Sequence, residues 1–263
     1  DRDVSRFVYS FQIPSYHPFL DYMKHLPQWD GLDRVTGLAK RISDDRLWIQ
    51  GFRLWMLGMA AQWTGKEMIH ANALVPLLIS RQQGLQKSTF CKLLVPNELQ
   101  AYYTDSFDLA SPAAAEQKLA LFGLINLDEF DKISEKKMPL LKNLLQMSRL
   151  NIRKSHQSNY SSLPRVASFI GTSNQKELLT DPTGSRRFLC IEVNEEIDSS
   201  PIDHAQLYAQ LKTQLDQGER YWMNKEEEAA WKKVNQSFYR ISAEEDVFNR
   251  YYHKPVSYTH LTL

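Results

Sequence analysis

The sequence has few cysteines, almost no net charge and no long apolar run, and each shortage excludes a class of protein. Cys91 and Cys190 are the two cysteines among 263 residues, which argues for core thiols in a reducing compartment rather than a disulfide framework. Lys and Arg number 32 against 31 Asp and Glu, so nucleic acid could be bound only by a local basic patch. No apolar run approaches the ~20 residues of a membrane span, and no signal peptide is present. We therefore expect a globular cytoplasmic protein without membrane contact.

The chain is long enough for one sizeable core with an accessory layer, and 43% of its residues are apolar. Asp1 rather than Met stands first, which indicates a piece of a longer protein. We predict a helical N-terminal subdomain over 1–68, an α/β core over 69–200, a C-terminal helical subdomain over 201–252 and a tail over 253–263. The tail resembles translated adapter sequence and is predicted not to be native.

Glycine is scarce in the one loop whose pattern calls for it. An apolar run over 74–79 gives way to a polar turn, after which apolar residues resume at helical spacing. A buried strand, a tight loop and a helix start form the context of the phosphate-binding pattern G-x-x-x-x-G-K-[ST]. Arg81 and Gln86 occupy the two glycine positions here, and Gly84 is the only glycine of the loop. The alternative interpretation is an ordinary polar turn between a strand and a helix.

If this loop binds a polyphosphate, consecutive residues hold it through backbone N–H groups that point at the ligand. The predicted contacts are Gln83, Gly84, Leu85, Gln86, Lys87, Ser88 and Thr89. Lys87 would neutralise phosphate charge, and the Ser88 hydroxyl would ligate Mg²⁺. Gln86 departs from the pattern, because a glycine before the lysine lets the backbone approach the ligand closely.

Three later segments carry polar side chains suited to the same chemistry. Asp128 and Glu129 follow an apolar run, and we predict that Asp128 supports Mg²⁺ while Glu129 is the general base for the attacking water. Asn174 follows another apolar run, and its amide is suited to position that water. Arg186 and Arg187 precede a third apolar run and suit an arginine finger, which stabilises the charge of a transferring phosphoryl group.

The order of apolar patterns predicts the fold class. Helix signals cover 45–63, 111–121, 134–147, 204–215 and 225–238, and strands, one of them over 99–107, alternate with the central helices. This alternation indicates an α/β fold with a mainly parallel sheet. Ligands bind such sheets at the carboxyl ends of the strands, where the candidate residues are predicted to lie. The Trp and Met positions of 45–63 are interpreted as core rather than as a surface for base stacking.

A basic segment without any acid lies between the acid pair and Asn174. We interpret it as a hairpin whose predicted DNA contacts are Arg149, Arg153, Lys154 and Tyr160, with Arg165 adding to its charge. Basic groups bind the phosphates of a single strand, and an aromatic ring stacks on its bases. A solvated surface loop and a contact to a neighbouring subunit's nucleotide are the alternatives.

These motifs resemble those of the virulence-associated E family, P-loop ATPases of phages and mobile elements that are similar to superfamily-three helicases and primase-helicases. The matching segments are 26–35 (LPQWDGLDRV), 83–90 (QGLQKSTF), 125–131 (INLDEFD), 170–174 (IGTSN) and 184–188 (GSRRF). The resemblance runs from about His17 to about Tyr239. The sequence departs from the family at Gln86, where glycine is usual, and at Gln28, which is inserted into the P-W-D-G-x-x-R element.

The resemblance implies an α/β P-loop NTPase fold, AAA+ or superfamily-three-like, with ATP and Mg²⁺ as ligands. It implies nucleotide contacts at Lys87 and Ser88, acids at Asp128 and Glu129, a sensor at Asn174 and a finger at Arg186 or Arg187. A finger that acts on the neighbour's nucleotide implies a homo-oligomeric ring, expected to be a hexamer, with the basic hairpin on single-stranded DNA in its pore. A primase domain, in this or another chain, is a further expected partner.

We therefore expect an ATP-dependent helicase-type ATPase in the replication of a phage or mobile element. The alternative is a DNA-binding or scaffold module in which Gln86 impairs hydrolysis, and its DNA affinity would fall with salt but not depend on ATP. The presence of every residue that the chemistry needs favours the active form. A nucleoside or small-molecule kinase is a third hypothesis, for which no lid of clustered arginines is seen.

Overall fold

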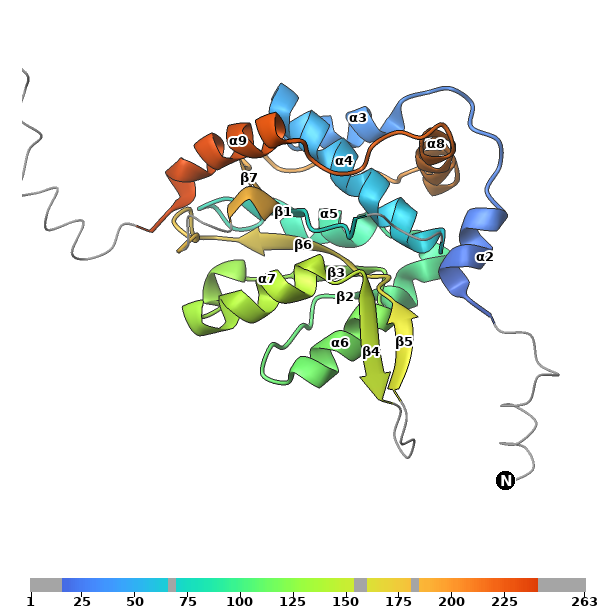
Figure 1. Ribbon diagram of the computed structural model, residues 1–263. Helices are drawn as coiled ribbons and strands as arrows, with labels where there is room; N and C mark the ends of the chain where they lie inside the picture. Colours follow the sequence, from blue (N-terminus) through green and yellow to red (C-terminus); the bar gives the residue numbers. More distant parts are fainter. Residues whose placement is uncertain (1–15, 66–69, 154–159, 181–184, 241–263) are drawn as a thin grey trace, which may run out of the picture.

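The central sheet is wholly parallel and sets the position of the other elements. In the computed structural model, which describes residues 16–65, 70–153, 160–180 and 185–240, five strands lie in the order β2-β3-β6-β1-β7 (Figure 1). They are β1 (Val75–Ile79), β2 (Tyr103–Thr104), β3 (Leu124–Leu127), β6 (Ser168–Ser173) and β7 (Phe188–Glu192). Every neighbouring pair is parallel, so the carboxyl ends meet at one edge. The predicted α/β class with a parallel sheet is confirmed.

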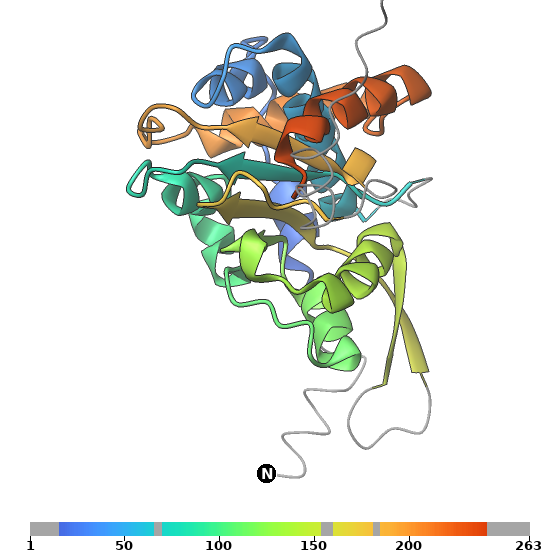
Figure 2. The same cartoon turned by 90° about the vertical axis from the view of Figure 1, so that its left-hand side faces the viewer.

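Helices cover both faces of this sheet (Figures 1 and 2). One face is covered by α2 (Pro18–Lys24), α3 (Arg34–Lys40), α4 (Arg46–Trp63), α5 (Lys87–Leu93), α8 (His204–Asp216) and Trp231 of α9 (Lys225–Val234). The other face is covered by α6 (Pro112–Leu121) and α7 (Met138–Gln146). Successive strand residues point to opposite faces, so Leu78 belongs to the first apolar cluster and Leu77 to the second.

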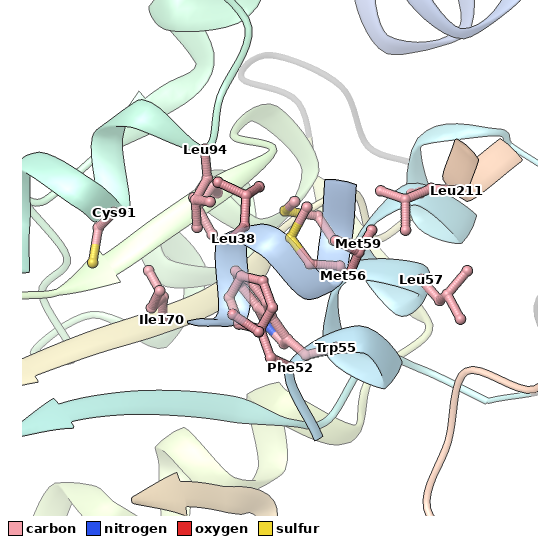
Figure 3. Close-up of a cluster of buried hydrophobic side chains, with 14 of the residues drawn as sticks. Leu38, Phe52, Trp55, Met56, Leu57, Met59, Cys91, Leu94, Ile170 and Leu211 are labelled. Carbon is pink, nitrogen blue, oxygen red and sulfur yellow. The ribbon is translucent and has the colours of Figure 1, made fainter. Parts of the chain in front are cut away.

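Helix α4 is the longest described helix and lies in the centre of the first cluster (Figure 3). Asp45 caps it by accepting a hydrogen bond from Trp48 N at 2.8 Å, and Trp48, Phe52 and Trp55 are fully buried. The Trp55 indole donates to Phe169 O of β6 at 2.9 Å. Burial leaves these rings no access to a nucleic-acid base, so the predicted helix and its role as core are confirmed.

Segments from both ends of the described chain pack together on the α4 face. Arg34 donates to both carboxylate oxygens of Asp30 at 2.7 Å. From α8, Gln206 Oε1 accepts from Asp30 N at 2.9 Å and Gln210 Oε1 accepts from Arg34 N at 2.8 Å. These bonds fasten the P-W-D-G-x-x-R element to α8 and give it a structural role. The predicted division of the chain into subdomains stays a prediction.

One predicted strand differs from the structure. Most of the segment 99–107 is not a strand: the 3₁₀ helix η1 (Asn97–Tyr102) leads into the two-residue strand β2. Strand β2 pairs with β3 at two positions only, Tyr103 with Leu124 and Thr104 with Ile125. The helical turn instead buries Leu99 in the core, which is the burial that the apolar pattern demanded.

The helix predicted over 134–147 also begins later than expected. A separate 3₁₀ turn, η3 (Glu135–Lys137), precedes α7, which starts at Met138. Pro139 has no backbone N–H and is compatible only with the first turn of a helix. The proline therefore sets where α7 can start.

The basic segment forms an antiparallel hairpin of β4 (Arg149–Arg153) and β5 (Tyr160–Pro164), which projects from the body beside α6 (Figures 1 and 2). Arg165 follows β5 and is only 2% exposed. A buried guanidinium cannot contact DNA, so the interpretation of Arg165 as part of the basic surface is wrong. The sequence pattern gave no sign of this burial, because arginine is mostly exposed.

Arg165 holds the root of the hairpin through backbone carbonyl groups. It donates to the carbonyl oxygens of Leu145 at 2.6 Å, Ala167 at 2.7 Å and Asn72 at 3.0 Å. These acceptors belong to the end of α7, the residue before β6 and the residues before β1. Burial lowers the pKa of the Arg165 guanidinium to about 9, which leaves it charged at neutral pH. The last carbonyls of α7 suit this charge because a helix ends in partial negative charge.

We expect Arg165→Met to lower the free energy of unfolding by at least about 3 kcal/mol, because several buried carbonyl oxygens lose their donor. Arg149→Met, which changes an exposed arginine of the same hairpin, should lower it by no more than about 0.5 kcal/mol. Urea unfolding followed by tryptophan fluorescence measures both. Equal losses in the two variants would contradict the anchoring role.

Candidate functional site

A cavity of ≈350 Å³ opens at the carboxyl edge of the sheet, where β1, β3 and β6 end. Its lining residues are Gln83, Gly84, Leu85, Gln86, Lys87, Ser88, Thr89, Asp128, Glu129, Thr172, Ser173 and Asn174. The structure thus brings the predicted loop contacts together with both predicted acids and the predicted sensor. We call this space the cradle cavity.

Lys87 is the first residue of α5, and only 8% of it is exposed. Its ammonium group donates to Ser80 Oγ at 2.5 Å and to Asn174 Oδ1 at 3.0 Å. Burial lowers the pKa of Lys87, and attraction to Asp128 opposes that shift. The amine therefore joins the ends of β1 and β6 and places a partly desolvated positive charge in the wall of the cavity.

Asp128 accepts hydrogen bonds from hydroxyl groups of two other elements. Ser88 Oγ donates to Asp128 Oδ1 at 3.1 Å, and Thr172 Oγ1 donates to the same oxygen. Adjacent oxygen ligands of an octahedral Mg²⁺, each about 2.1 Å from the ion, lie about 3 Å apart. The Ser88 and Asp128 oxygens have this spacing and so fit the predicted Mg²⁺ or one of its bound waters.

Two residues of the cradle cavity have a left-handed backbone. Gln86 has φ 60° and ψ 19°, and Glu129 has φ 52° and ψ 48°. Within the described residues, these are the only non-glycine residues with positive φ. The conformation costs about 1–2 kcal/mol for a residue with a Cβ, and such strain concentrates at functional sites. Both strained residues line the cradle cavity, which supports this end of the sheet as the candidate functional site.

Gln86 occupies a glycine position of the loop pattern and leaves the cradle cavity open. Its Oε1 accepts from Thr89 Oγ1 at 2.9 Å, and its Nε2 donates to Glu196 Oε1 at 3.4 Å. These two bonds hold the side chain at the wall of the cavity. Its backbone adopts the left-handed conformation that a glycine would adopt without strain.

Sequence reasoning assigned no role to several polar partners at this edge. Ser80 follows β1 and is 2% exposed, and Thr172 of β6 is 4% exposed. Asp131, three residues after Asp128, accepts from Ser173 Oγ at 2.7 Å. These groups hold Lys87, Asp128 and the tip of β6 in place. The sequence shows only that a polar residue stands at the end of an apolar strand. This pattern does not predict which group that residue will bond.

Arg186 and Arg187 lie at the opposite edge of the sheet, in η4 (Ser185–Arg187) just before β7. The five residues of β7 span roughly 16 Å, which separates the start of this strand from the carboxyl edge. Figure 2 shows the loop after β1 at the left and the hairpin at the lower right. One protomer therefore does not bring these arginines to the cradle cavity. They line a second cavity of ≈410 Å³, where Arg186 pairs with Glu228 at 3.2 Å.

The predicted DNA contacts lie on the hairpin and are partly described. Arg149 is exposed and donates to Ser162 Oγ at 3.0 Å across the hairpin. Arg153 and Tyr160 are partners in the register of β4 and β5, and Lys154 lies outside the described residues. The hairpin root adjoins the edge of Arg186 rather than the edge of Lys87, since Ser148 and Arg186 line the same cavity.

The described residues hold no group of three or more His, Cys, Asp or Glu side chains placed to bind a metal ion. Mg²⁺ needs no such group, because it keeps several waters and takes one or two carboxylates together with phosphate oxygens. None of the described helices is long and apolar enough to cross a membrane. Cys91 and Cys190 are buried free thiols, as predicted.

Fold and site together define an α/β protein with a strand–loop–helix cradle at the carboxyl edge of a parallel sheet. The model of the virulence-associated protein E-like domain matches residues 23–240, and the chain belongs to this family.

No curated protein matches the chain. The apo structure of the NrS-1 C-terminal region (305–718) aligns with a TM-score of 0.47 and 15% identity, over 92% of this chain and 56% of that one. The A-form apo structure of the same region has a TM-score of 0.46 and 17% identity, over 86% and 52%. This chain thus spans about half the length of those structures.

We expect Gln86→Gly to change the free energy of unfolding by less than about 1 kcal/mol, because relief of the left-handed strain is offset by a freer unfolded chain. Gln86→Val should lower it by at least about 1 kcal/mol, since a β-branched residue resists positive φ. Urea unfolding of the two variants beside the parent protein measures the difference. A valine variant as stable as the glycine variant would mean that Gln86 is not left-handed in solution.

Proposed function

We propose that this chain is an ATP-dependent helicase-type ATPase that acts on DNA in the replication of a phage or mobile genetic element. The supporting observation is the convergence on one cavity of a buried amine, a hydroxyl–carboxylate pair, a second carboxylate and an amide. These groups belong to Lys87, Ser88, Asp128, Glu129 and Asn174. Membership of the virulence-associated protein E-like family supports the biological setting.

In the proposed site, the backbone N–H groups of residues 83–89 and the Lys87 amine bind the phosphates of ATP. The cradle cavity, at ≈350 Å³, has the size of a small ligand pocket. The Lys87 ammonium group has three N–H donors, of which Ser80 and Asn174 accept two, and the third serves a phosphate oxygen. Mg²⁺, when bound at Ser88 and Asp128, supplies neutralisation of the phosphate charge.

Hydrolysis then needs a base and an orienting group. Glu129 accepts a proton from water as the water oxygen bonds to the γ-phosphorus, and the bond from that phosphorus to the bridging oxygen of ADP breaks. Asn174 has its Oδ1 on Lys87 and keeps its amide N–H groups to orient the water. Glu129 forms an ion pair with Lys132 at 2.7 Å, and the two side chains are 52% and 67% exposed. Solvent weakens such an exposed pair, so the Glu129 carboxylate can leave Lys132 and accept the proton.

Arg186 and Arg187 can reach this site only from a neighbouring copy. The proposal therefore includes a homo-oligomeric ring in which the arginine edge of one subunit faces the cradle cavity of the next. The hairpin would contact single-stranded DNA through Arg149, Arg153, Lys154 and Tyr160, because basic and aromatic side chains serve backbone contact and stacking.

A hydrolysis-impaired DNA-binding module is the second candidate, and the left-handed Gln86 favours it. A glutamine at this position adds a side chain to the wall where phosphates approach. The module would bind DNA with the same salt dependence and show no ATP-dependent step. We prefer the active enzyme, because the groups that hydrolysis needs are present and held together by hydrogen bonds.

Glu129→Gln should lower kcat for ATP about 10²- to 10⁴-fold, since it removes the general base, while ATP binding persists. Lys87→Ala should weaken ATP binding as well as turnover. Lys92→Ala, an exposed lysine of the same helix, is the matched control and should leave both unchanged. Steady-state phosphate release, with and without single-stranded DNA, measures these rates. Wild-type turnover in Glu129→Gln would contradict the assignment.

Arg149→Ala should weaken binding of single-stranded DNA and reduce the slope of log K against log salt by about 0.7, the share of one phosphate contact. Lys40→Ala, an exposed lysine of α3 that is 54% accessible, is the control and should leave the slope unchanged. Fluorescence anisotropy of a labelled oligonucleotide over a salt series gives both slopes. An unchanged slope for Arg149→Ala would remove this residue from the DNA surface.

A further inference from the structure

The cradle cavity can hold phosphates but offers no surface for a nucleotide base. Among its described lining residues none is aromatic, and Leu85 is the only large apolar one. Bases are bound chiefly by stacking on aromatic side chains or by burial between apolar ones. If ATP binds here, the wall for its purine ring must come from elsewhere.

The second cavity has the chemistry that the first lacks. At ≈410 Å³ it is lined by the aromatic residues His70, Tyr221 and Trp222 beside Arg186 and Arg187. The ring centroids of His70 and Trp222 are 4.6 Å apart, and those of Tyr221 and Trp222 are 5.1 Å apart. Tyr221 also accepts a hydrogen bond from His70 N at 3.4 Å. The rings therefore support one another and are placed before any ligand arrives.

The two cavities lie at opposite edges of the same parallel sheet. The cradle cavity is at the carboxyl ends of β1, β3 and β6, and the second cavity is at the amino ends of β1 and β7. Surfaces at opposite edges cannot meet within one protomer, but they meet in a head-to-tail contact, which repeats and can close into a ring. Their charges are complementary, with Asp128 and Glu129 at one edge and Arg186 and Arg187 at the other.

We propose that the second cavity of one copy completes the nucleotide site of the next, with Trp222 as the stacking surface for the purine ring of ATP. This inference rests on the proposed function, which places ATP in the cradle cavity. The partner is a second copy of this chain, and it contributes an aromatic wall as well as a cation. Arg186 leaves Glu228 for a phosphate oxygen at modest cost, because that pair is 51% and 34% exposed and solvent weakens it.

Trp222→Ala should raise KM for ATP about tenfold through the lost stack, and Trp222→Phe should restore most of the affinity. Tyr16→Ala, which removes an aromatic side chain that is 71% exposed elsewhere, is the matched control and should leave KM unchanged. The affinity for single-stranded DNA, measured by anisotropy, should not change in Trp222→Ala. A lower DNA affinity with an unchanged KM would mean that the cavity binds a base of DNA, and it would overturn the proposal.

A mixing experiment separates action on the neighbour from action within one chain. Lys87→Ala keeps an intact second cavity, and Trp222→Ala keeps an intact cradle cavity. An intact site forms where a Trp222→Ala subunit supplies the cradle cavity and a Lys87→Ala subunit supplies the second cavity. Random assembly of equal amounts gives this arrangement at about one interface in four. At an ATP concentration near the wild-type KM, equal mixing should raise the rate about threefold above the mean of the separate proteins, given the tenfold change in KM. A rate equal to that mean would place the stacking surface within one chain and overturn the proposal.

The outcome for the proposed function is read separately. Wild-type protein that hydrolyses no ATP contradicts the ATPase assignment whatever Trp222 does. In that case calorimetry of ATP binding to wild type and Trp222→Ala, at a protein concentration where copies associate, still tests the shared site. An equal Kd for the two proteins would overturn it, and a Kd about tenfold higher in the variant would support it.

Discussion

Parallel pairing of β1, β6 and β3 is the constraint on which the candidate site depends. Ile79 of β1 is in register with Ser173 of β6, and Leu127 of β3 is in register with Gly171. The residues that follow these strands therefore come side by side. A slip of one residue would turn every strand side chain to the other face. Gly171 permits the close fit, because a Cβ there would lie 2.7 Å from the Leu77 side chain and 3.2 Å from Leu127 O.

The cradle cavity is held in place before any ligand binds. Lys87 is fixed by Ser80 and Asn174, and Asp128 is fixed by Ser88 and Thr172. This order has a cost, because a lysine is partly desolvated and two residues are left-handed. Stability is commonly sacrificed in this way where a function needs groups in fixed positions. The large core around α4 offsets the loss.

The two edges of the sheet have different chemistry. The carboxyl edge gathers hydroxyl, amide, amine and carboxylate groups around one cavity, whereas the amino edge carries the hairpin root, the arginine pair and an aromatic cluster. Arg165 connects the hairpin to the residues before β1 and to the residue before β6. Short, rigid strands thus link the predicted DNA surface to the predicted nucleotide surface. Under the proposed function, a force on the hairpin would act on β1 and β6, and the residues that follow these strands, Ser80 and Asn174, hold Lys87.

Local pattern was enough to predict much of this molecule. Apolar spacing and an acidic cap define α4, an apolar run followed by a polar turn defines the strand–loop–helix unit, and acids after an apolar run indicate the end of β3. Such features depend on residues close together in the chain, and their physical causes act over a few residues. The α/β class follows from their order.

The rest was decided by contacts between distant segments. Strand β2 is short because the 3₁₀ helix η1 occupies the residues before it. Arg165 is buried because carbonyl groups from three separate segments of the chain surround it. Arg186 and Arg187 lie away from Lys87 because β7 runs parallel to β1, which puts the start of one strand far from the end of the other. A sequence specifies how residues are spaced along a strand, but the direction and order of the strands determine which ends meet.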